Sequence, residues 1–238
     1  METTLDTIRD IRLYQPKTGY RFSVDALLLY DFVNLKRVMS IADLGAGGGV
    51  VGLLLAKKYP EARVTLVELQ KGLFELAEKN IALNDLGKRV TALKADIRKL
   101  PLVIKPASLV VSNPPFRRPL TGRISRQEER AIARHEIKLK LPELIRAASG
   151  LLKHHGRLCL VYLPERLPEL IERLRAERLE PKRMRLVHSK KETVAKMLLM
   201  EAVKDGNAGL EIEPPVFIYN EDGSYNEKMR ELFGCPAS

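Results

Sequence analysis

The chain is predicted to fold as an α/β protein in which helices cover both faces of a mostly parallel sheet. Three observations predict this class. Short apolar runs alternate along the chain with longer segments that have the spacing of an amphipathic helix. A glycine-rich turn, residues 45–49, directly follows one apolar run and precedes a helix-like segment. With 238 residues and a 45% hydrophobic share, the chain can bury a core of domain size.

The first elements are expected to alternate between helix and strand. A helix over 23–34 begins at Ser23, whose hydroxyl is suited to cap it. A strand over 38–44 leads into the glycine turn, and a helix over 50–58 leaves it. A strand over 63–68 is followed by a helix over 71–85, in which residues at three-and-four spacing indicate one buried face. These residues are Leu73, Leu76, Ala77, Asn80, Ile81 and Asn84.

The later elements complete the expected sheet. They are strands over 90–95 and 107–112, a helix over 138–152, a strand over 156–163, a helix over 164–178, and strands over 183–188 and 194–203. Only five residues join the last two strands, too few for a helical crossover. We therefore expect a hairpin, which makes the last of seven strands antiparallel to its neighbours.

The whole chain is expected to form one domain over residues 1–238. Within it we expect an N-terminal cap segment at about 1–36 and a core at about 37–205. The tail beyond Gly206 is expected to add an edge segment, at about 206–238.

Charge and cysteine content narrow the class of function. Lys and Arg outnumber Asp and Glu by 41 to 30, which gives a net charge of +11. This charge indicates either a solvated basic surface or a polyanionic partner such as nucleic acid. Cys159 and Cys235 are the only cysteines, which excludes a disulfide framework, and no spacing indicates a metal site. The sequence contains neither a long apolar run nor a signal peptide, so we expect a cytoplasmic protein. We also expect a monomer, an expectation that no motif carries.

The glycine turn and two strand-end acids predict a nucleoside cofactor site. Glycines allow the backbone to turn sharply and a ligand to approach it, and the amides that start the next helix favour an anionic group. Glu68 ends the second expected strand, where a carboxylate can accept both ribose hydroxyls. Asp96 follows the third, where it can accept a hydrogen bond from an adenine amino group. The residues that form this part of the site are Asp43, Gly45, Gly47, Gly49, Glu68 and Asp96.

A second motif follows the expected strand over 107–112. Asn113, Pro114, Pro115 and Phe116 form a stiff loop, because both prolines fix their own φ and keep the preceding residue extended. The Asn113 side chain and the Pro114 carbonyl can accept hydrogen bonds from an amino group, and Phe116 can stack on the base that carries it. NAD would use the glycine turn and Glu68, but it gives no reason for this motif. S-adenosyl-L-methionine (SAM) accounts for both.

Taken together, these motifs resemble those of the bacterial tRNA adenine-N6-methyltransferases, which act on the valine tRNA adenine next to the anticodon. The resemblance spans about Tyr14 to Glu231. The segments that carry it, besides the motifs above, are 14–17, 19–29, 122, 129–136, 151–157, 164–167 and 180–185. It implies a Rossmann-like class I methyltransferase fold, SAM as cofactor, and an RNA substrate. It also implies that the opening segment lies over the cofactor, so Gln15, Arg21, Ser23 and Asp25 become SAM neighbours.

The substrate base is left open by one departure from the family pattern. Many tRNA adenine enzymes have tyrosine followed by phenylalanine where this chain has Phe116, and phenylalanine also occurs at this place in rRNA guanine-amine methyltransferases. Methylation of a protein glutamine and a non-catalytic SAM- or RNA-binding module are further alternatives. The glutamine enzymes typically carry an extra N-terminal domain, whereas 42 residues precede Asp43 here; with the basic net charge, this leads us to expect a nucleic acid as acceptor.

Two clusters of basic residues are candidates for phosphate binding. The first follows the acceptor motif and consists of Arg117, Arg118, Arg123, Arg126, Arg130 and Arg134. It can hold phosphates while one base enters the pocket, although pairing with Glu128 and Glu129 is an alternative. The second consists of Lys182, Arg183, Arg185, Lys190 and Lys191. Protection of an exposed hairpin edge by charge explains this second cluster equally well.

Overall fold

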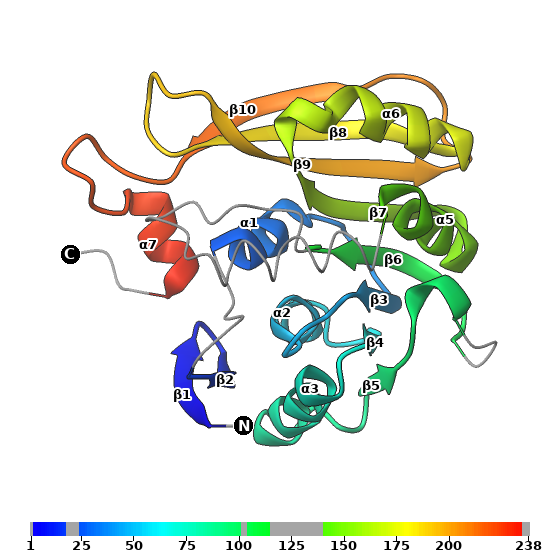
Figure 1. The fold of residues 1–238 in the computed structure, drawn as a ribbon, viewed down its shortest axis with the longest axis vertical. Helices are drawn as coiled ribbons and strands as arrows, with labels where there is room; N and C mark the ends of the chain where they lie inside the picture. The colour runs from blue at the N-terminus through cyan, green and yellow to red at the C-terminus, as the bar shows by residue number, and fades with distance from the viewer. Residues whose placement is uncertain (1, 18–23, 101–103, 115–139, 235–238) are drawn as a thin grey trace.

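The computed structural model describes residues 2–17, 24–100, 104–114 and 140–234. An eight-stranded sheet crosses its centre (Figure 1), in the order β10-β8-β9-β7-β6-β3-β4-β5. Its strands are β3 (Ser40–Leu44), β4 (Arg63–Glu68), β5 (Val90–Lys94), β6 (Ala107–Ser112), β7 (Leu152–Tyr162), β8 (Leu179–His188), β9 (Ala195–Lys204) and β10 (Glu211–Phe217). Every neighbouring pair is parallel except the two pairs that contain β9.

Helices cover the two faces of this sheet, as the alternation of apolar segments predicts. The helices are α1 (Val24–Phe32), α2 (Val50–Lys58), α3 (Lys71–Leu83), α5 (Leu141–Leu151), α6 (Leu167–Ala176) and α7 (Glu227–Phe233). One buried cluster contains residues of α1, α2 and α3, and the other contains residues of α5 and α6. Successive residues of one strand belong to different clusters, as the two-residue period of a strand requires: Leu109 faces the first and Val110 the second.

The sheet differs from the expectation at its C-terminal end. The hairpin of β8 and β9 is antiparallel as predicted, but β10 adds an eighth strand at the edge, parallel to β8. The expected count of seven is therefore wrong by one strand. Pro214 and Pro215 lie where the register of β10 shifts, and residues without an N–H are tolerated at such an edge position.

A two-stranded sheet lies outside the main one and was not expected from the sequence. It consists of β1 (Thr3–Ile8) and β2 (Ile11–Pro16), which form an antiparallel hairpin. This hairpin packs against α3, and Arg9 at its tip donates a hydrogen bond to the carbonyl of Glu231 in α7 (Figure 1). Among the described residues no helix is long and apolar enough to span a membrane.

Candidate cofactor and acceptor site

The carboxyl ends of three neighbouring strands bring the predicted site residues to one edge of the sheet. Strand β3 lies between β6 and β4, and all three are parallel. The chain proceeds outward through β4 and β5 on one side of β3, and through β6 and β7 on the other. Ligands of open α/β sheets bind at such a switch point, outside the carboxyl ends of the strands. Topology therefore brings Asp43, Glu68 and Asn113 to the same edge of the sheet.

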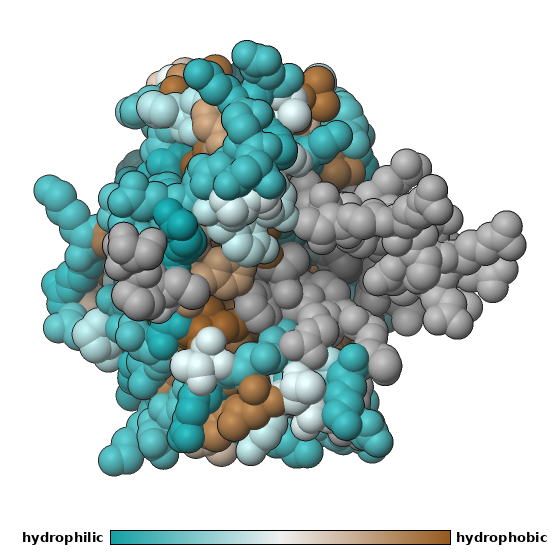
Figure 2. Space-filling model, turned by 90° about the vertical axis from the view of Figure 1, so that its left-hand side faces the viewer, coloured by the Kyte–Doolittle hydropathy of each residue, from teal (hydrophilic) through white to brown (hydrophobic). Residues whose placement is uncertain are grey.

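A pocket opens at this edge and contains about 490 Å³ of empty space, including open solvent at its mouth. Figure 2 views the molecule from the left-hand side of Figure 1 and shows hydrophobic residues recessed between hydrophilic ones. The lining comes from β2, α1, β3, the glycine turn, α2, α3 and the residue after β6. It consists of Tyr14, Gln15, Pro16, Ala26, Asp43, Gly45, Ala46, Gly48, Val50, Val51, Leu73, Leu76, Asn80 and Asn113.

The glycine turn requires glycine for backbone conformation and for space. Gly45, Gly47 and Gly49 have φ values of 75°, 57° and 90°, which L side chains rarely adopt. A Cβ on Gly49 would lie 2.9 Å from Leu66 Cδ1, so this turn packs directly on β4. Of the three predicted glycines, Gly45 lines the pocket, while Gly47 and Gly49 set the conformation of the turn behind it.

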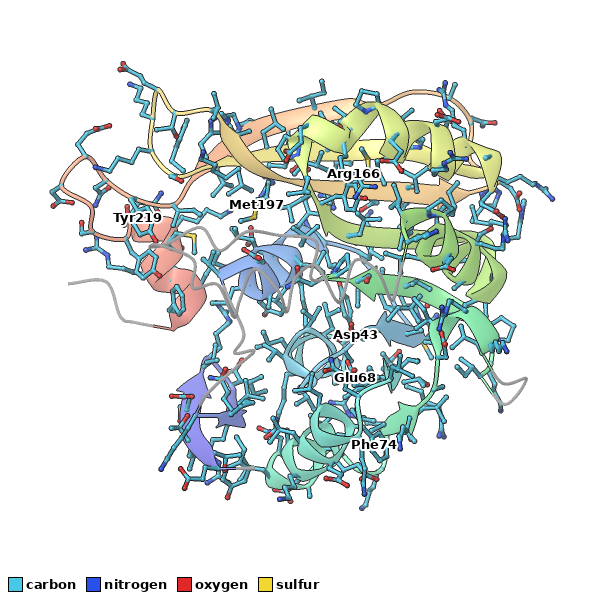
Figure 3. All side chains as sticks on the ribbon, viewed as in Figure 1. Asp43, Glu68, Phe74, Arg166, Met197 and Tyr219 are labelled. Carbon is cyan, nitrogen blue, oxygen red and sulfur yellow. The ribbon has the colours of Figure 1, made fainter. Side chains whose placement is uncertain are left out.

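The side chain of Asp43 is buried in the pocket wall. Its Oδ2 accepts a hydrogen bond of 2.9 Å from the backbone N–H of Gly52. Burial raises the pKa of Asp43 to about 7; the Gly52 hydrogen bond lowers it in part, and the nearby Glu68 raises it further. Asp43 and Glu68 lie near each other in Figure 3. With a pKa of about 7, Asp43 would be more fully ionised when a cation binds in the pocket.

The carboxylate of Glu68 links the glycine turn to the residue that precedes α3. Its Oε2 accepts a 2.9 Å hydrogen bond from the N–H of Gly47, and its Oε1 accepts one of 2.8 Å from the N–H of Gln70. Each oxygen keeps further acceptor capacity, so the carboxylate can still receive a ribose hydroxyl. The contact with Gly47 is a role that the sequence did not indicate.

Asp96 is engaged by a neighbouring cation. Arg98 Nε lies 2.9 Å from Asp96 Oδ1, and Arg98 Nη2 lies 2.5 Å from Asp96 Oδ2. This hydrogen-bonded pair lowers the pKa of Asp96. The carboxylate therefore stays charged, and the predicted contact with an adenine amino group depends on acceptor capacity that Arg98 leaves free.

The acceptor motif is described only in its first half. Asn113 follows β6 directly and lines the pocket, and Pro114 is buried. Ser112 Oγ donates a 2.7 Å hydrogen bond to the carbonyl of Leu44, which joins the ends of β6 and β3 beside the pocket. Pro115 and Phe116 lie outside the described residues.

Of the four N-terminal residues that the resemblance implies as SAM neighbours, the structure describes Gln15 and Asp25. Gln15 lines the pocket, and its Nε2 donates a 2.6 Å hydrogen bond to Asp6 Oδ2. Asp25 is buried in the first turn of α1. Arg21 and Ser23 lie outside the described residues, as do all six arginines from Arg117 to Arg134.

Sequence reasoning missed several residues that line the pocket. Tyr14 and Pro16 come from a hairpin that carried no strong turn signal. Asn80 was predicted only as part of the buried stripe of a helix, yet it contacts both β2 and the glycine turn. A fully buried asparagine in an apolar stripe is the signal that could have drawn attention to it.

The second basic cluster proves to be divided between two environments. Arg183 and Arg185 form ion pairs with Glu201, Glu213 and Asp31 inside the molecule. Lys190 and Lys191 lie in the connection between β8 and β9.

Cys159 is buried, as expected for an inert thiol, and burial raises the pKa of its thiol well above the usual range.

The parallel sheet with its antiparallel β9, and the glycine-lined pocket at the switch point, define a Rossmann-like class I methyltransferase. The predicted fold class is thereby confirmed. The chain belongs to the methyltransferase small domain family, whose model matches residues 23–174.

Comparison with known proteins confirms the resemblance found in the sequence. A tRNA1(Val) (adenine(37)-N6)-methyltransferase of Porphyromonas gingivalis is 33% identical over 178 residues, 71% of this chain and 69% of the relative. An enzyme of the same name from Aeromonas hydrophila is 29% identical over 156 residues, 65% of this chain and 64% of the relative.

Solved structures support the fold. A predicted O-methyltransferase of Agrobacterium tumefaciens has a TM-score of 0.70 at 24% identity, with 89% of this chain and 96% of that chain covered. A Thermus thermophilus 16S rRNA N2 G1207 methyltransferase, solved with AdoMet and guanosine, has a TM-score of 0.58 at 22% identity, with 85% and 50% covered.

Proposed function

We propose that this protein transfers a methyl group from SAM to the N6 amine of an adenine in tRNA, in the anticodon loop. The observation that carries the proposal is the shared pocket: Asn113 at the end of β6 opens into the same space as the glycine turn and Asp43. Relatives at up to 33% identity, named as tRNA adenine-N6 methyltransferases, support this choice of substrate.

The residues present fit SAM. The positive φ of the glycines in the glycine turn lets the backbone approach a ligand without Cβ atoms between them. Asp43 would face the cationic amino acid end, Glu68 the ribose and Asp96 the adenine. Gln15 is part of the lining, and Asp25 precedes the lining residue Ala26 in α1. When bound, SAM supplies a methyl group that is activated by attachment to a sulfonium.

Asn113 and Pro114 would hold the acceptor. The lone pair of an adenine amine is delocalised into the ring, so the amine is a poor nucleophile in its planar form. Hydrogen bonds from its N–H groups to the Asn113 side-chain oxygen and the Pro114 carbonyl would orient the nitrogen and favour its pyramidal form. Phe116, outside the described residues, would stack on the base.

The six arginines from Arg117 to Arg134 follow this motif in the chain. We propose that they hold phosphates around the extruded base, with the opening segment, core and C-terminal segment acting as one unit.

The test is transfer of a labelled methyl group. The purified protein is incubated with labelled SAM and with unmodified tRNA, rRNA or a release-factor-like protein, and nucleosides are then analysed. The proposal expects labelled N6-methyladenosine from tRNA alone. Labelled N2-methylguanosine or methylated glutamine would show that the acceptor is not adenine. SAM binding without any methyl transfer would show that the protein is a binding module and not an enzyme.

A further inference from the structure

The hairpin of β1 and β2 lines the cofactor pocket although it lies outside the main sheet. Tyr14, Gln15 and Pro16 of β2 belong to the lining, and β2 has β1 as its strand partner. A strand with a partner on one side leaves alternate N–H and C=O groups without a strand partner on the other. On β2, groups of this kind at Tyr14 are bound by Asn80 of α3, and those at Arg12 by Asn84 just after that helix.

Two asparagines replace the missing strand: Asn80 lies in α3, and Asn84 caps the C-terminal end of that helix. Asn84 Oδ1 accepts a 2.9 Å hydrogen bond from the N–H of Arg12, and its Nδ2 donates one of 2.7 Å to the Arg12 carbonyl. Asn80 does the same for Tyr14, at 2.7 Å from the N–H and 3.1 Å to the carbonyl. Each carboxamide offers one acceptor and one donor to the strand, as a peptide group would.

The spacing of the two elements explains why this arrangement fits. Arg12 and Tyr14 are two residues apart on a strand, a rise of about 6.8 Å. Asn80 in α3 and Asn84 at its C-terminal cap are four residues apart, which at the helical rise per residue is about 6.0 Å. The spacing of the two carboxamides therefore nearly matches the spacing of the backbone groups of β2 that have no strand partner.

Asn80 makes one contact that Asn84 does not. Its Nδ2 also donates a 2.9 Å hydrogen bond to the carbonyl of Gly48 in the glycine turn. The corresponding second donor of Asn84 returns to the Asn80 carbonyl within α3, at 2.7 Å. Tyr14 and Gly48 both line the pocket, so a single buried side chain joins two separate segments of its wall.

We propose that Asn80 is a positioning residue that couples the docking of β2 to the shape of the glycine turn, so that SAM binds tightly only when the hairpin is docked. The identity of the ligand rests on the proposed function, whereas the coupling rests on the contacts above. The hairpin is also held at its tip, where Arg9 binds the carbonyl of Glu231. Removal of the Asn80 side chain should therefore loosen the pocket wall without releasing the hairpin.

The test compares Asn80→Ala with Asn84→Ala, two identical truncations one helical turn apart. We expect Asn80→Ala to raise the KM for SAM roughly tenfold or more, the size of effect that one or two hydrogen bonds can produce, with kcat changed less than about threefold. Asn84→Ala should raise that KM by less than about threefold, because its contact ends at Arg12, outside the pocket lining. Equal effects of the two truncations would overturn the coupling.

Hydrogen exchange supplies a second readout, which does not depend on enzyme turnover. In the wild-type protein the amides of Arg12 and Tyr14 should be protected, and S-adenosylhomocysteine should slow their exchange further. In Asn80→Asp, which keeps the acceptor for Tyr14 and loses both donors, the ligand should no longer slow exchange. Wild-type amides that exchange at unprotected rates would overturn the proposal. If the wild type fails to bind SAM or S-adenosylhomocysteine at all, the proposed function is wrong, which is a different result.

Discussion

At the scale of single residues, the pocket depends on a carboxyl group whose ionisation is costly. Asp43 is buried, it has one backbone donor on Oδ2, and its pKa is raised to about 7. A cation in the pocket would favour the charged form. Cofactor binding and protein stability should therefore both depend on pH, in opposite directions.

The pH dependence of stability follows from the two pKa values. In the unfolded chain Asp43 loses its proton near 3.8, and in the folded protein near 7. Between these values the folded state binds more protons, so this group makes the free energy of unfolding fall as pH rises, by up to about 4 kcal/mol in total. Relative to the wild type, Asp43→Asn should gain stability from pH 4 to pH 7 and keep that gain above pH 7. Urea unfolding at pH 5 to 8 measures this, and a variant less stable than the wild type at pH 8 would contradict it.

The pH dependence of binding has the opposite sign. The affinity for SAM should rise as pH increases through about 7, because Asp43 then carries the charge that attracts the cationic end of the cofactor. In Asp43→Asn the affinity should be lower and nearly independent of pH in this range. Calorimetric titration at pH 6, 7 and 8 measures the affinity of both proteins for SAM. If the affinity of wild type and variant changed with pH in the same way, Asp43 would not contact the cofactor.

Asn113 should affect turnover far more than cofactor binding. The Asn113→Ala substitution removes one oriented polar group from the acceptor, which we expect to lower kcat roughly a hundredfold. The KM for SAM should stay within about threefold. Asn207→Ala, the same truncation in an exposed connection, is the control and should behave as the wild type. Near-normal turnover by Asn113→Ala would rule out the proposed grip on the amine.

Some of these residues could be predicted and others could not, for a physical reason. Asp43, Glu68 and Asn113 each follow or end an apolar run, and parallel strands bring their carboxyl ends to one edge. The contacts of Asn80 with Tyr14 and Gly48 join segments 66 and 32 residues away. No local pattern encodes such contacts, because they depend on how the hairpin packs.

At the scale of elements, the sequence predicts strands and helices best where they are buried. Strands β4 and β6 and helix α2 have the predicted bounds, since continuous apolar runs leave little ambiguity. The hairpin of β1 and β2 was missed because its tip is Arg9 and Asp10, without the Asn or Gly that marks most tight turns. Strand β10 was expected only as an edge segment, because two prolines interrupt it.

The packing of α2 on β4 depends on Gly52. A Cβ at Gly52 would lie 2.1 Å from Leu66 Cδ2 and 3.2 Å from Asp43 Oδ2. Leu66 cannot turn away easily, because its Cδ1 already lies against Gly49 in a fully buried position. Gly52→Ala should therefore lower the free energy of unfolding by about 1–3 kcal/mol through overpacking.

Gly48→Ala is the matched control for this prediction. A Cβ at Gly48 would meet its nearest neighbours, Asn80 Nδ2 and Leu76 Cδ2, at 3.5 Å, an ordinary contact. Its effect on stability should therefore stay within about 0.5 kcal/mol. Urea unfolding of both variants decides the matter, and equal stabilities would mean that α2 can shift to accept the extra methyl group.

At the scale of the whole molecule, the net charge of +11 does not describe one uniform surface. Some of the basic residues form ion pairs between strands of the sheet. Arg183 binds Glu201 of β9 at 2.8 Å and Glu213 of β10 at 2.9 Å, and its guanidinium lies over the Phe32 ring of α1 at 4.3 Å. One cation thus connects three elements distant in sequence, and it is only 18% exposed. Such a residue contributes to stability and is not available to RNA phosphates.

The substitution Arg183→Met tests this division of the charge. It leaves Glu201, which is 3% exposed, with Arg157 as the remaining ion-pair partner among the described residues. Loss of one partner from a buried pair costs about 3–5 kcal/mol, and we expect the lower end because Glu201 keeps that second cation. Lys182→Met is the control. It removes the neighbouring charge, whose hydrogen bonds to the carbonyls of Asn207 and Ala208 are exposed, so its effect should stay below about 1 kcal/mol.

The same variant separates stability from RNA binding. The net charge of Arg183→Met is lower by one, yet the slope of log Kd for tRNA against log salt should not change, because that slope counts phosphates neutralised at the interface. Urea unfolding and filter binding at several salt concentrations measure the two effects. A flatter salt slope with unchanged stability would show that Arg183 leaves its carboxylates to bind RNA, and that the basic residues of β8 belong to the substrate surface after all.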